Sequence, residues 1–299
     1  EYLFHAMFSL MLFSNVFVMY PKAQVSAERI QEILDAEPMI KNPEQGITET
    51  NNEGTLEFEN VTFVYPDGEE PVIKNVSFSA KKGETIAFIG STGSGKSTLI
   101  NLIPRFYDVT EGSIRIDGID VRKFNLKALR KKIGFIRQKN LLFTGTIKSN
   151  IKFGKPHATH DEVENSAKIA QAYDFITTKE KGFDEPISEG GSNVSGGQKQ
   201  RLSIARALVR KSEIYIFDDS FSALDFKTDA ILRKALKKET KDAIVLIVAQ
   251  RIGSIMDADK IIVLDEGKVV GVGKHKELLS TCNVYHEIAL SQLTEEELA

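Results

Sequence analysis

The sequence feature that most constrains the fold of this chain is a glycine-rich stretch directly after a short apolar run. Residues 85–89 read TIAFI and residues 90–98 read GSTGSGKST. The pattern G-x-x-x-x-G-K-S between a buried strand and a helix is typical of a loop whose backbone N–H groups surround phosphate. A flexible linker rich in glycine and serine is not expected at this place, nor is it expected to end in Lys-Ser. The sequence therefore predicts a nucleotide-binding loop.

Each part of this loop has a predicted role. The helix that follows presents its positive end to a phosphate, Lys96 reaches the terminal phosphates, and the Ser97 hydroxyl ligates Mg²⁺. The residues predicted to contact the nucleotide here are Gly90, Ser91, Thr92, Gly93, Ser94, Gly95, Lys96, Ser97 and Thr98.

Charge and cysteine content narrow the class of protein. The chain has 299 residues, 41% of them hydrophobic, which suits one large or two ordinary globular domains. Its net charge is −3 and it has no basic stripe, so nucleic acid is not expected as a partner. Cys282 is the only cysteine, which excludes an internal disulfide and a cysteine-based zinc site and favours a reducing compartment.

The first residues form a long apolar segment. Residues 2–20 read YLFHAMFSLMLFSNVFVMY, a length that fits a membrane-spanning helix. The preceding basic residues and the small-residue cleavage site of a signal peptide are missing. Polar interruptions at His5, Ser9, Ser14 and Asn15 are expected to face other helices or a cavity. The alternative interpretation is a buried helix of a soluble protein.

The next residues predict the domain boundaries. Between Val25 and Leu34, apolar residues recur at helical spacing, which predicts an amphipathic helix that leads out of the apolar segment. The polar stretch that ends in Asn51-Asn52-Glu53-Gly54 predicts a linker. Because the chain begins at Glu1 without a methionine, we expect it to be part of a longer protein. The predicted divisions are the end of a transmembrane helix over 1–20, an amphipathic helix and linker over 21–54, and a nucleotide-binding domain over 55–299.

Strand patterns flank the loop. Apolar and polar residues alternate over most of 56–65, and a second strand-like run covers 72–80 after the turn Pro66-Asp67-Gly68, which predicts antiparallel strands. Two interpretations of Tyr65 stay open: a ring that stacks on a nucleotide base, and a half-buried strand tyrosine. Further short strands are predicted over 113–116 and 132–138.

The second half of the chain predicts helices and buried parallel strands. A capping box at Thr159 and a helix after Ser195 indicate a helical insertion over about 140–210. Continuous apolar runs end at Asp218-Asp219 and at Gln250, as in parallel strands covered on both faces. Site residues of such sheets follow the strand ends. The remaining predictions are a strand pair over 261–272, helices over 274–293 and an acidic tail over 294–299.

One motif identifies a family. Residues 194–201, VSGGQKQR, lie on a predicted helix ahead of the strand that ends in Asp218, and they resemble the signature motif of ATP-binding cassette (ABC) proteins. The resemblance extends over about residues 52–290. The other matching positions are Tyr65 as the A-loop aromatic, Gln138 as the Q-loop, Asp218 as the Walker B aspartate, Ser222-Ala223-Leu224-Asp225 as the D-loop, Gln250 where the switch histidine is expected, and Glu189-Gly190-Gly191 as the x-loop of exporters.

The resemblance implies the end of the last transmembrane helix and the nucleotide-binding domain of an ABC exporter half-transporter. The implied fold class is α/β: a P-loop NTPase core with a mixed, mainly parallel sheet, an antiparallel β-subdomain and an inserted α-helical signature subdomain, preceded by a transmembrane helix segment. The implied ligands are ATP and Mg²⁺, the metal held by Ser97, Gln138 and Asp218. The implied location is the bacterial plasma membrane, with the nucleotide-binding domain in the cytoplasm.

The resemblance also implies partners. Two cassettes of this family dimerise head to tail, so that each phosphate loop faces the signature of the other across ATP. The signature residues Ser195, Gly196, Gly197 and Gln198 would therefore contact the nucleotide of a second half-transporter. Their place at a helix start agrees, because free N–H groups there favour an anion. The chain would also associate with its own transmembrane domain.

Two positions depart from the family pattern. Asp219 stands where a catalytic glutamate is normal, and Gln250 stands in place of the histidine. A carboxylate one methylene short reaches an attacking water poorly, and glutamine cannot become cationic. The resemblance is therefore to the degenerate half of a heterodimeric multidrug-type exporter, with catalytic-site residues Asp219, Gln250 and Gln138 that turn over slowly.

Other functions stay open on sequence alone. A homodimer with two slow sites is one alternative, and an ATP-binding regulatory module without turnover is another. A soluble ABC-type ATPase of DNA repair or translation is disfavoured, because a second cassette, a coiled-coil insertion and a basic surface are all missing. Drugs, lipids and peptides remain open as substrates.

Overall fold

The computed structural model of the chain describes residues 1–51, 54–222 and 224–292. The predicted tail over 294–299 lies outside them. Contacts between residues divide the chain into two compact units, Glu1–Lys41 and Asn42–Ala299.

The first unit consists mainly of one long helix, α1 (Tyr2–Asp35). Every side chain of this helix is exposed, including aromatic residues such as Phe8 and Phe17. Within the part of the chain that the structure describes, α1 alone is long and apolar enough to cross a membrane by length and composition. The helix continues through Pro21, although proline has no N–H to donate to the preceding turn. The two predicted helical segments therefore form one element.

The second unit begins with an antiparallel sheet in the strand order β2-β1-β4-β5. In β1 (Thr55–Phe63), Leu56, Phe58 and Val61 are buried, as the alternating pattern predicted. The predicted turn is also present, because the Gly68 N–H donates to the Tyr65 carbonyl over 2.8 Å. The strands are β1 (Thr55–Phe63), β2 (Ile73–Lys81), β4 (Glu111–Ile116) and β5 (Ile119–Asp120).

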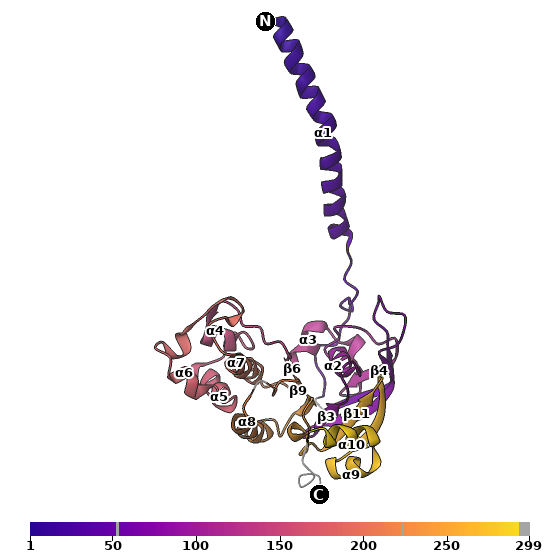
Figure 1. The fold of residues 1–299 in the computed structure, drawn as a ribbon, viewed down its shortest axis with the longest axis vertical. Helices are drawn as coiled ribbons and strands as arrows, with labels where there is room; N and C mark the ends of the chain where they lie inside the picture. Colours follow the sequence, from indigo (N-terminus) through magenta and orange to yellow (C-terminus); the bar gives the residue numbers. More distant parts are fainter. Residues whose placement is uncertain (52–53, 223, 293–299) are drawn as a thin grey trace. The chain divides into compact units, whose positions relative to one another are not determined.

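A six-stranded, mainly parallel sheet has the order β12-β11-β3-β10-β9-β6 (Figure 1). Apart from β12, its strands are largely apolar because both faces are covered: in β3, Ile86 and Phe88 face one core, while Ala87 and Ile89 face the other. Only β12 pairs antiparallel within this sheet, confirming the mixed sheet. The strands are β3 (Thr85–Ile89), β6 (Ile133–Ile136), β9 (Ile214–Asp218), β10 (Ile244–Val248), β11 (Lys260–Asp265) and β12 (Lys268–Gly273).

Helices cover both faces of this sheet. The core on one face joins it to the antiparallel sheet through α2, whose Leu99, Ile100 and Leu102 are buried. The core on the other face joins the helical insertion, α8 and the C-terminal helices. Outside the insertion the helices are α2 (Lys96–Leu102), η1 (Val121–Lys123), α3 (Leu126–Lys131), α8 (Phe226–Glu239), η4 (Ile252–Ser254), α9 (His275–Thr281) and α10 (Asn283–Leu290).

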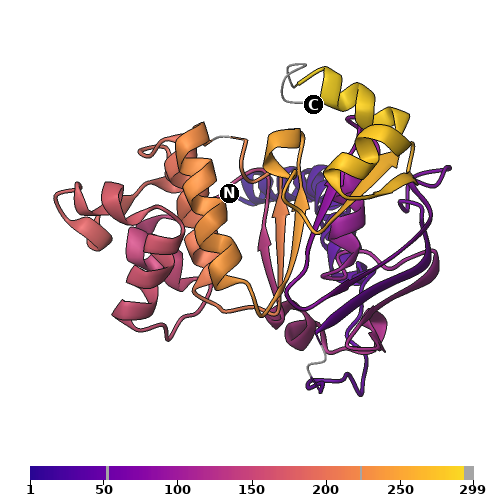
Figure 2. The same cartoon turned by 90° about the horizontal axis from the view of Figure 1, so that it is seen from below.

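The helical insertion lies on the β6 and β9 side of the second unit, away from α9 and α10 (Figure 2). Its predicted capping box is present: Thr159 Oγ1 accepts from the Glu162 N–H, and Glu162 accepts from the Thr159 N–H. The predicted apolar sides, such as Val163 and Leu202, are buried. The insertion contains β7 (Gly145–Thr146), α4 (Ile147–Lys152), α5 (His160–Ile169), α6 (Tyr173–Thr177), η2 (Gly182–Asp184), β8 (Pro186–Ile187), η3 (Glu189–Gly191) and α7 (Gly196–Leu208).

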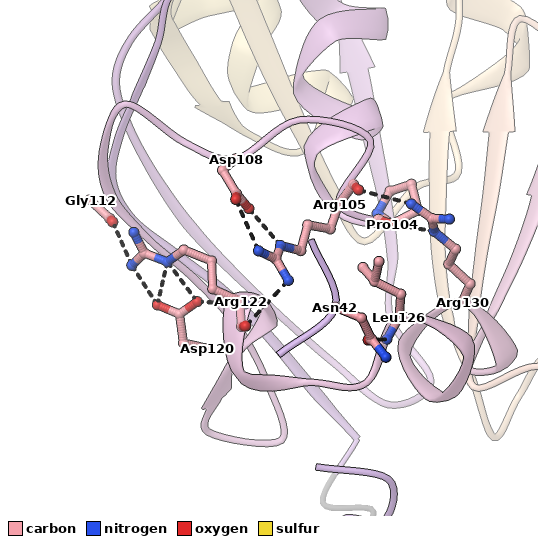
Figure 3. A network of polar contacts seen from close by, with 9 residues as sticks. All are labelled: Asn42, Pro104, Arg105, Asp108, Gly112, Asp120, Arg122, Leu126 and Arg130. Atoms are coloured by element: carbon pink, nitrogen blue, oxygen red, sulfur yellow. Dashed lines mark hydrogen bonds and ion pairs between the residues drawn. The ribbon is translucent and has the colours of Figure 1, made fainter. Parts of the chain in front are cut away.

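Part of the predicted linker belongs to the second unit. Ile47 bridges to Phe124, and its N–H and carbonyl bond to Lys123 and Asn125 at 2.9 Å each. The Leu126 N–H donates to the Asn42 side chain over 2.9 Å (Figure 3). Polar composition predicted a linker, but these groups form hydrogen bonds with the rest of the second unit.

A polar network holds the far end of α2, the helix that starts at the phosphate loop. Arg105 forms two hydrogen bonds to the Asp108 carboxylate, at 2.7 and 3.0 Å (Figure 3). Arg130 of α3 donates to the carbonyls of Pro104 and Arg105, both over 3.1 Å. Because Arg105 is buried, its two bonds to Asp108 satisfy a guanidinium that burial would otherwise penalise. The network fixes α2 against α3.

Candidate active site

The glycine-rich loop takes the backbone course that its sequence predicts. It leaves β3 at Ile89 and enters α2 at Lys96. Gly90 has φ 153°, and a Cβ there would lie 2.0 Å from the Leu264 carbonyl oxygen. Gly95 has φ 94°, and a Cβ there would lie 2.7 Å from Ile73. Both positions therefore need glycine for space as well as for conformation.

The Lys96 side chain lies inside this loop. Its Nζ donates to the carbonyls of Gly90 and Ser91 at 2.8 and 2.7 Å and contacts Ser94 Oγ at 3.2 Å. Burial lowers the pKa of Lys96, and the nearby carboxylates of Asp218 and Asp219 partly oppose that shift. A lysine ammonium held within a glycine-rich loop at a helix start is placed where it can bind terminal phosphates.

Ser97 and Asp218 meet at the start of α2 and the end of β9. Ser97 Oγ donates to Asp218 Oδ1 over 2.9 Å. Burial raises the pKa of Asp218; the Ser97 hydrogen bond opposes this, and Asp219 adds to it. A hydroxyl and a carboxylate are hard oxygen ligands, and Mg²⁺ in nucleotide sites takes few protein ligands and completes its shell with phosphate and water. The pair therefore fits Mg²⁺ bound with ATP.

Asp219 is held by two amide side chains. Its Oδ2 accepts from Gln138 Nε2 at 3.1 Å and from Gln250 Nε2 at 2.9 Å. Its backbone is left-handed, with φ 46°, and its N–H donates to the Val248 carbonyl over 2.9 Å. Burial raises the pKa of Asp219, while the Gln138 hydrogen bond and the charge of Arg251 oppose this. Both amides are uncharged donors, and among the described residues no cation makes an ion pair with this carboxylate.

These groups share one pocket of about 390 Å³ at the carboxyl ends of β3, β9 and β10. Sequence reasoning did not identify two of the residues that line it. Val248 is the last residue of β10, two positions before Gln250, and could have been found by that position, whereas Val72 carries no local signal. The lining residues are Val72, Thr92, Gly93, Gly95, Lys96, Ser97, Thr98, Gln138, Asp218, Asp219, Val248 and Gln250.

Tyr65 stands beside this pocket without lining it. Its hydroxyl is 3.0 Å from Thr98 Oγ1 at the start of α2. Its ring makes edge contacts with Phe63 and Tyr107, at centroid distances of 4.8 and 5.2 Å. The ring is therefore packed next to the phosphate loop, and its predicted stacking on a base stays a prediction.

The signature residues do not line this pocket. Ser195 is exposed and caps α7: its Oγ accepts from the Gln198 N–H over 3.3 Å, and Gln198 Oε1 accepts from the Ser195 N–H over 3.1 Å. The predicted D-loop lies nearer, because Ser222 Oγ donates to the Asp219 carbonyl over 3.1 Å. Within it, Ala223 lies outside the described residues, and Asp225 caps α8.

Comparisons with known proteins agree with this geometry. A family model described as ABC transporter matches residues 73–222. An uncharacterized ABC transporter ATP-binding protein of Mycobacterium tuberculosis is 41% identical over 98% of this chain and 50% of its own length. A Staphylococcus aureus protein, named as a candidate multidrug export ATP-binding/permease protein, is 44% identical over 86% of this chain and 44% of its own length. The chain thus spans about half the length of these relatives.

A solved structure extends the match to the fold. The structure of a bacterial Atm1-family ABC exporter with ATP bound superposes with a TM-score of 0.87 and 32% identity. It covers 94% of this chain and 49% of that exporter chain. The phosphate loop, the Ser97–Asp218 contact, the family match over half the chain and this shared fold lead to one conclusion. The chain belongs to the ABC transporter family and contains its ATP-binding domain.

Proposed function

We propose that this chain is the ATP-binding and ATP-hydrolysing subunit of an ABC exporter, and that its own site is degenerate. Degenerate here means that the site keeps its nucleotide-binding residues but lacks the usual glutamate and histidine. The observation that carries the proposal is the carboxylate of Asp219, to which Gln138 and Gln250 both donate at one oxygen. The intact phosphate loop and the Ser97–Asp218 pair support firm binding of Mg²⁺-ATP.

The geometry around Asp219 supports slow hydrolysis. A general base must come within hydrogen-bond reach of the attacking water, and a displacement near 1 Å costs about 100-fold in rate. Asp219 is one methylene shorter than glutamate, and its Oδ2 is already occupied by two amide donors. Gln250 offers the γ-phosphate region a neutral donor, which stabilises a charged transition state less than a cation does. ATP would therefore act at this site mainly as a ligand that joins two cassettes.

The signature supports a role at a second site. Ser195–Gln198 form a helix start outside the chain's own pocket, and its first residues, Ser195 and Gly196, are exposed. Backbone N–H groups at such a helix start suit a phosphate. We therefore assign these residues to the nucleotide of a second half-transporter, where the usual glutamate and histidine carry out hydrolysis. A heterodimer with head-to-tail cassettes follows from this assignment.

The membrane location is part of the same proposal. Helix α1 is long and apolar enough to span a bilayer, and all its side chains are exposed within the chain. The relatives that are longer than this chain include a protein named for multidrug export and a bacterial Atm1-family ABC exporter. We assign α1 to the end of a transmembrane domain in the bacterial plasma membrane, with the cassette in the cytoplasm and closure of the cassettes coupled to export.

Steady-state ATPase activity of the full-length protein with its partner tests the proposal. Asp219→Ala in this chain is compared with replacement of the glutamate at the equivalent position of the partner. The expected result is that Asp219→Ala leaves most of the turnover, while the partner replacement abolishes it. Loss of turnover in Asp219→Ala would show that Asp219 is a working base and would overturn the degenerate assignment.

A further inference from the structure

The C-terminal end of the described chain touches the loop that carries Gln250. The side chain of Gln292 makes two hydrogen bonds to the backbone on either side of Arg251. Its Nε2 donates to the Gln250 carbonyl over 2.7 Å, and its Oε1 accepts from the Ile252 N–H over 2.9 Å. The carboxamide thus donates to one backbone group of the loop and accepts from another, as a backbone amide does in a β-sheet.

The chemistry of the partners fixes the orientation of this amide. A backbone carbonyl only accepts and a backbone N–H only donates, so the reversed Gln292 amide would lose both bonds. The Ile252 N–H opens η4, and the residue before it, Arg251, supplies no side-chain cap. Gln292 therefore provides the acceptor that the start of this short helix lacks locally. Both contacts depend on a side chain 40 or more positions away.

Gln292 is presented by a well-anchored helix. It follows α10, and its N–H donates to the Ala289 carbonyl over 3.0 Å. In α10, Tyr285 and Ala289 have no exposed surface, and the Tyr285 hydroxyl lies 2.7 Å from His275 Nδ1. On the other side of the loop, Arg233 of α8 donates to the Gly253 carbonyl over 2.8 Å. The loop is thus held between α8 and the end of α10.

We propose that Gln292 is a positioning residue for the ATP site: it fixes the backbone at residues 250–252 so that the Gln250 side chain meets Asp219. Gln250 connects the two ends of this arrangement. Its carbonyl accepts a hydrogen bond from Gln292, and its Nε2 donates to Asp219 Oδ2 at 2.9 Å. The inference rests on the proposed function, since it concerns turnover at the site assigned there.

The test measures single-turnover hydrolysis of ATP by the full-length protein with its partner, whose own catalytic glutamate is replaced by glutamine. Gln292→Ala removes both bonds, and we expect the rate to fall about 3- to 10-fold with ATP affinity unchanged. Gln292→Glu keeps the size and the acceptor but sets a carboxylate against the Gln250 carbonyl, so a similar fall is expected. Ser291→Ala is the matched control, because among the described residues its hydroxyl bonds to the Ile288 carbonyl of α10 and not to the Gln250 loop. Its rate should equal that of the parent.

A double-mutant cycle separates positioning from general stabilisation. If Gln292 acts through Gln250, then Gln292→Ala has no further effect on the rate when Gln250 is already alanine. Equal losses in both backgrounds, or a Gln292→Glu rate equal to the parent, would overturn the inference and indicate a purely structural contact. If the parent protein neither binds nor hydrolyses ATP, the proposed function fails instead, so the two failures are distinguishable.

Discussion

Ser97 donates a hydrogen bond to the Asp218 carboxylate over 2.9 Å, although 121 positions separate the two residues in the chain. The contact joins the first turn of α2 to the last residue of β9. The phosphate loop follows β3, and Asp218 is the last residue of β9. Because β10 pairs with both strands, only this one strand separates them. This pairing brings together two of the three residues that the resemblance implies for Mg²⁺, Ser97 and Asp218, with Gln138 as the third.

The first prediction concerns this oxygen pair. Ser97→Ala removes one ligand, and we expect the Mg²⁺ concentration needed for ATP binding to rise about 10-fold. Ser97→Thr keeps the hydroxyl and should behave as the parent does. ATP binding to the full-length protein, titrated at several Mg²⁺ concentrations, checks this. An unchanged Mg²⁺ requirement in Ser97→Ala would show that the hydroxyl does not bind the metal.

The second prediction restores the missing groups. Asp219→Glu combined with Gln250→His lengthens the base by a methylene and supplies a side chain that can become cationic. We expect hydrolysis at this chain's own site to rise about 10-fold or more in single-turnover measurements. Each single change is the control and should give a smaller gain. A double variant as slow as the parent would mean that another feature limits this site.

The third prediction separates the two roles of the signature serine. Ser195→Ala removes the cap of α7 and should lower the free energy of unfolding by about 1 kcal/mol. It should also reduce hydrolysis at the partner's site while ATP affinity at this chain's own site is unchanged. Ser192→Ala, an exposed serine outside the cap, is the matched control. Reduced binding at the chain's own site would contradict the assignment of the signature to the partner.

The fourth prediction concerns acid stability. Asp117 accepts hydrogen bonds from Thr50 Oγ1 at 2.6 Å, the Gly54 N–H at 2.8 Å and Lys132 Nζ at 3.2 Å. Burial by itself would raise the pKa of Asp117, but these bonds outweigh it and hold the pKa below the ordinary 3.8. The unfolded carboxyl takes up a proton near 3.8 and the folded one only at lower pH. The stabilisation is therefore complete above that value and is lost as pH falls through the folded pKa.

Asp117→Asn tests this sign. The variant should lose about 2 kcal/mol in the free energy of unfolding at pH 7, because bonds to a charged group are replaced by weaker ones. The difference from the parent should shrink as the pH falls below about 4. Asp67→Asn, which changes an exposed turn carboxylate, is the control. Denaturant unfolding of the full chain at each pH checks the result, and a constant difference across pH would contradict it.

The sequence predicted the phosphate loop, most strands of the main sheet and several helices because local patterns encode them, whereas α3 and α8 were not predicted. The phosphate loop has glycines where a Cβ would collide, as at Gly90 and Gly95. The capping box at Thr159 and the apolar runs before Asp218 and Gln250 mark one helix start and two strand ends. The family resemblance also indicated which of these ends carry nucleotide-binding residues, and those roles stay predictions.

Other features follow only from the tertiary arrangement. The order β3-β10-β9 brings three strand ends together, and this order has no local sequence signal. On either side of β9, the neighbours β10 and β6 bring Gln250 and Gln138 to the same oxygen of Asp219. Likewise, Val72 lines the pocket without any motif, and Gln292 reaches the Gln250 loop because α10 packs on the sheet core. Local patterns determine which elements form, whereas contacts between distant residues depend on how those elements pack.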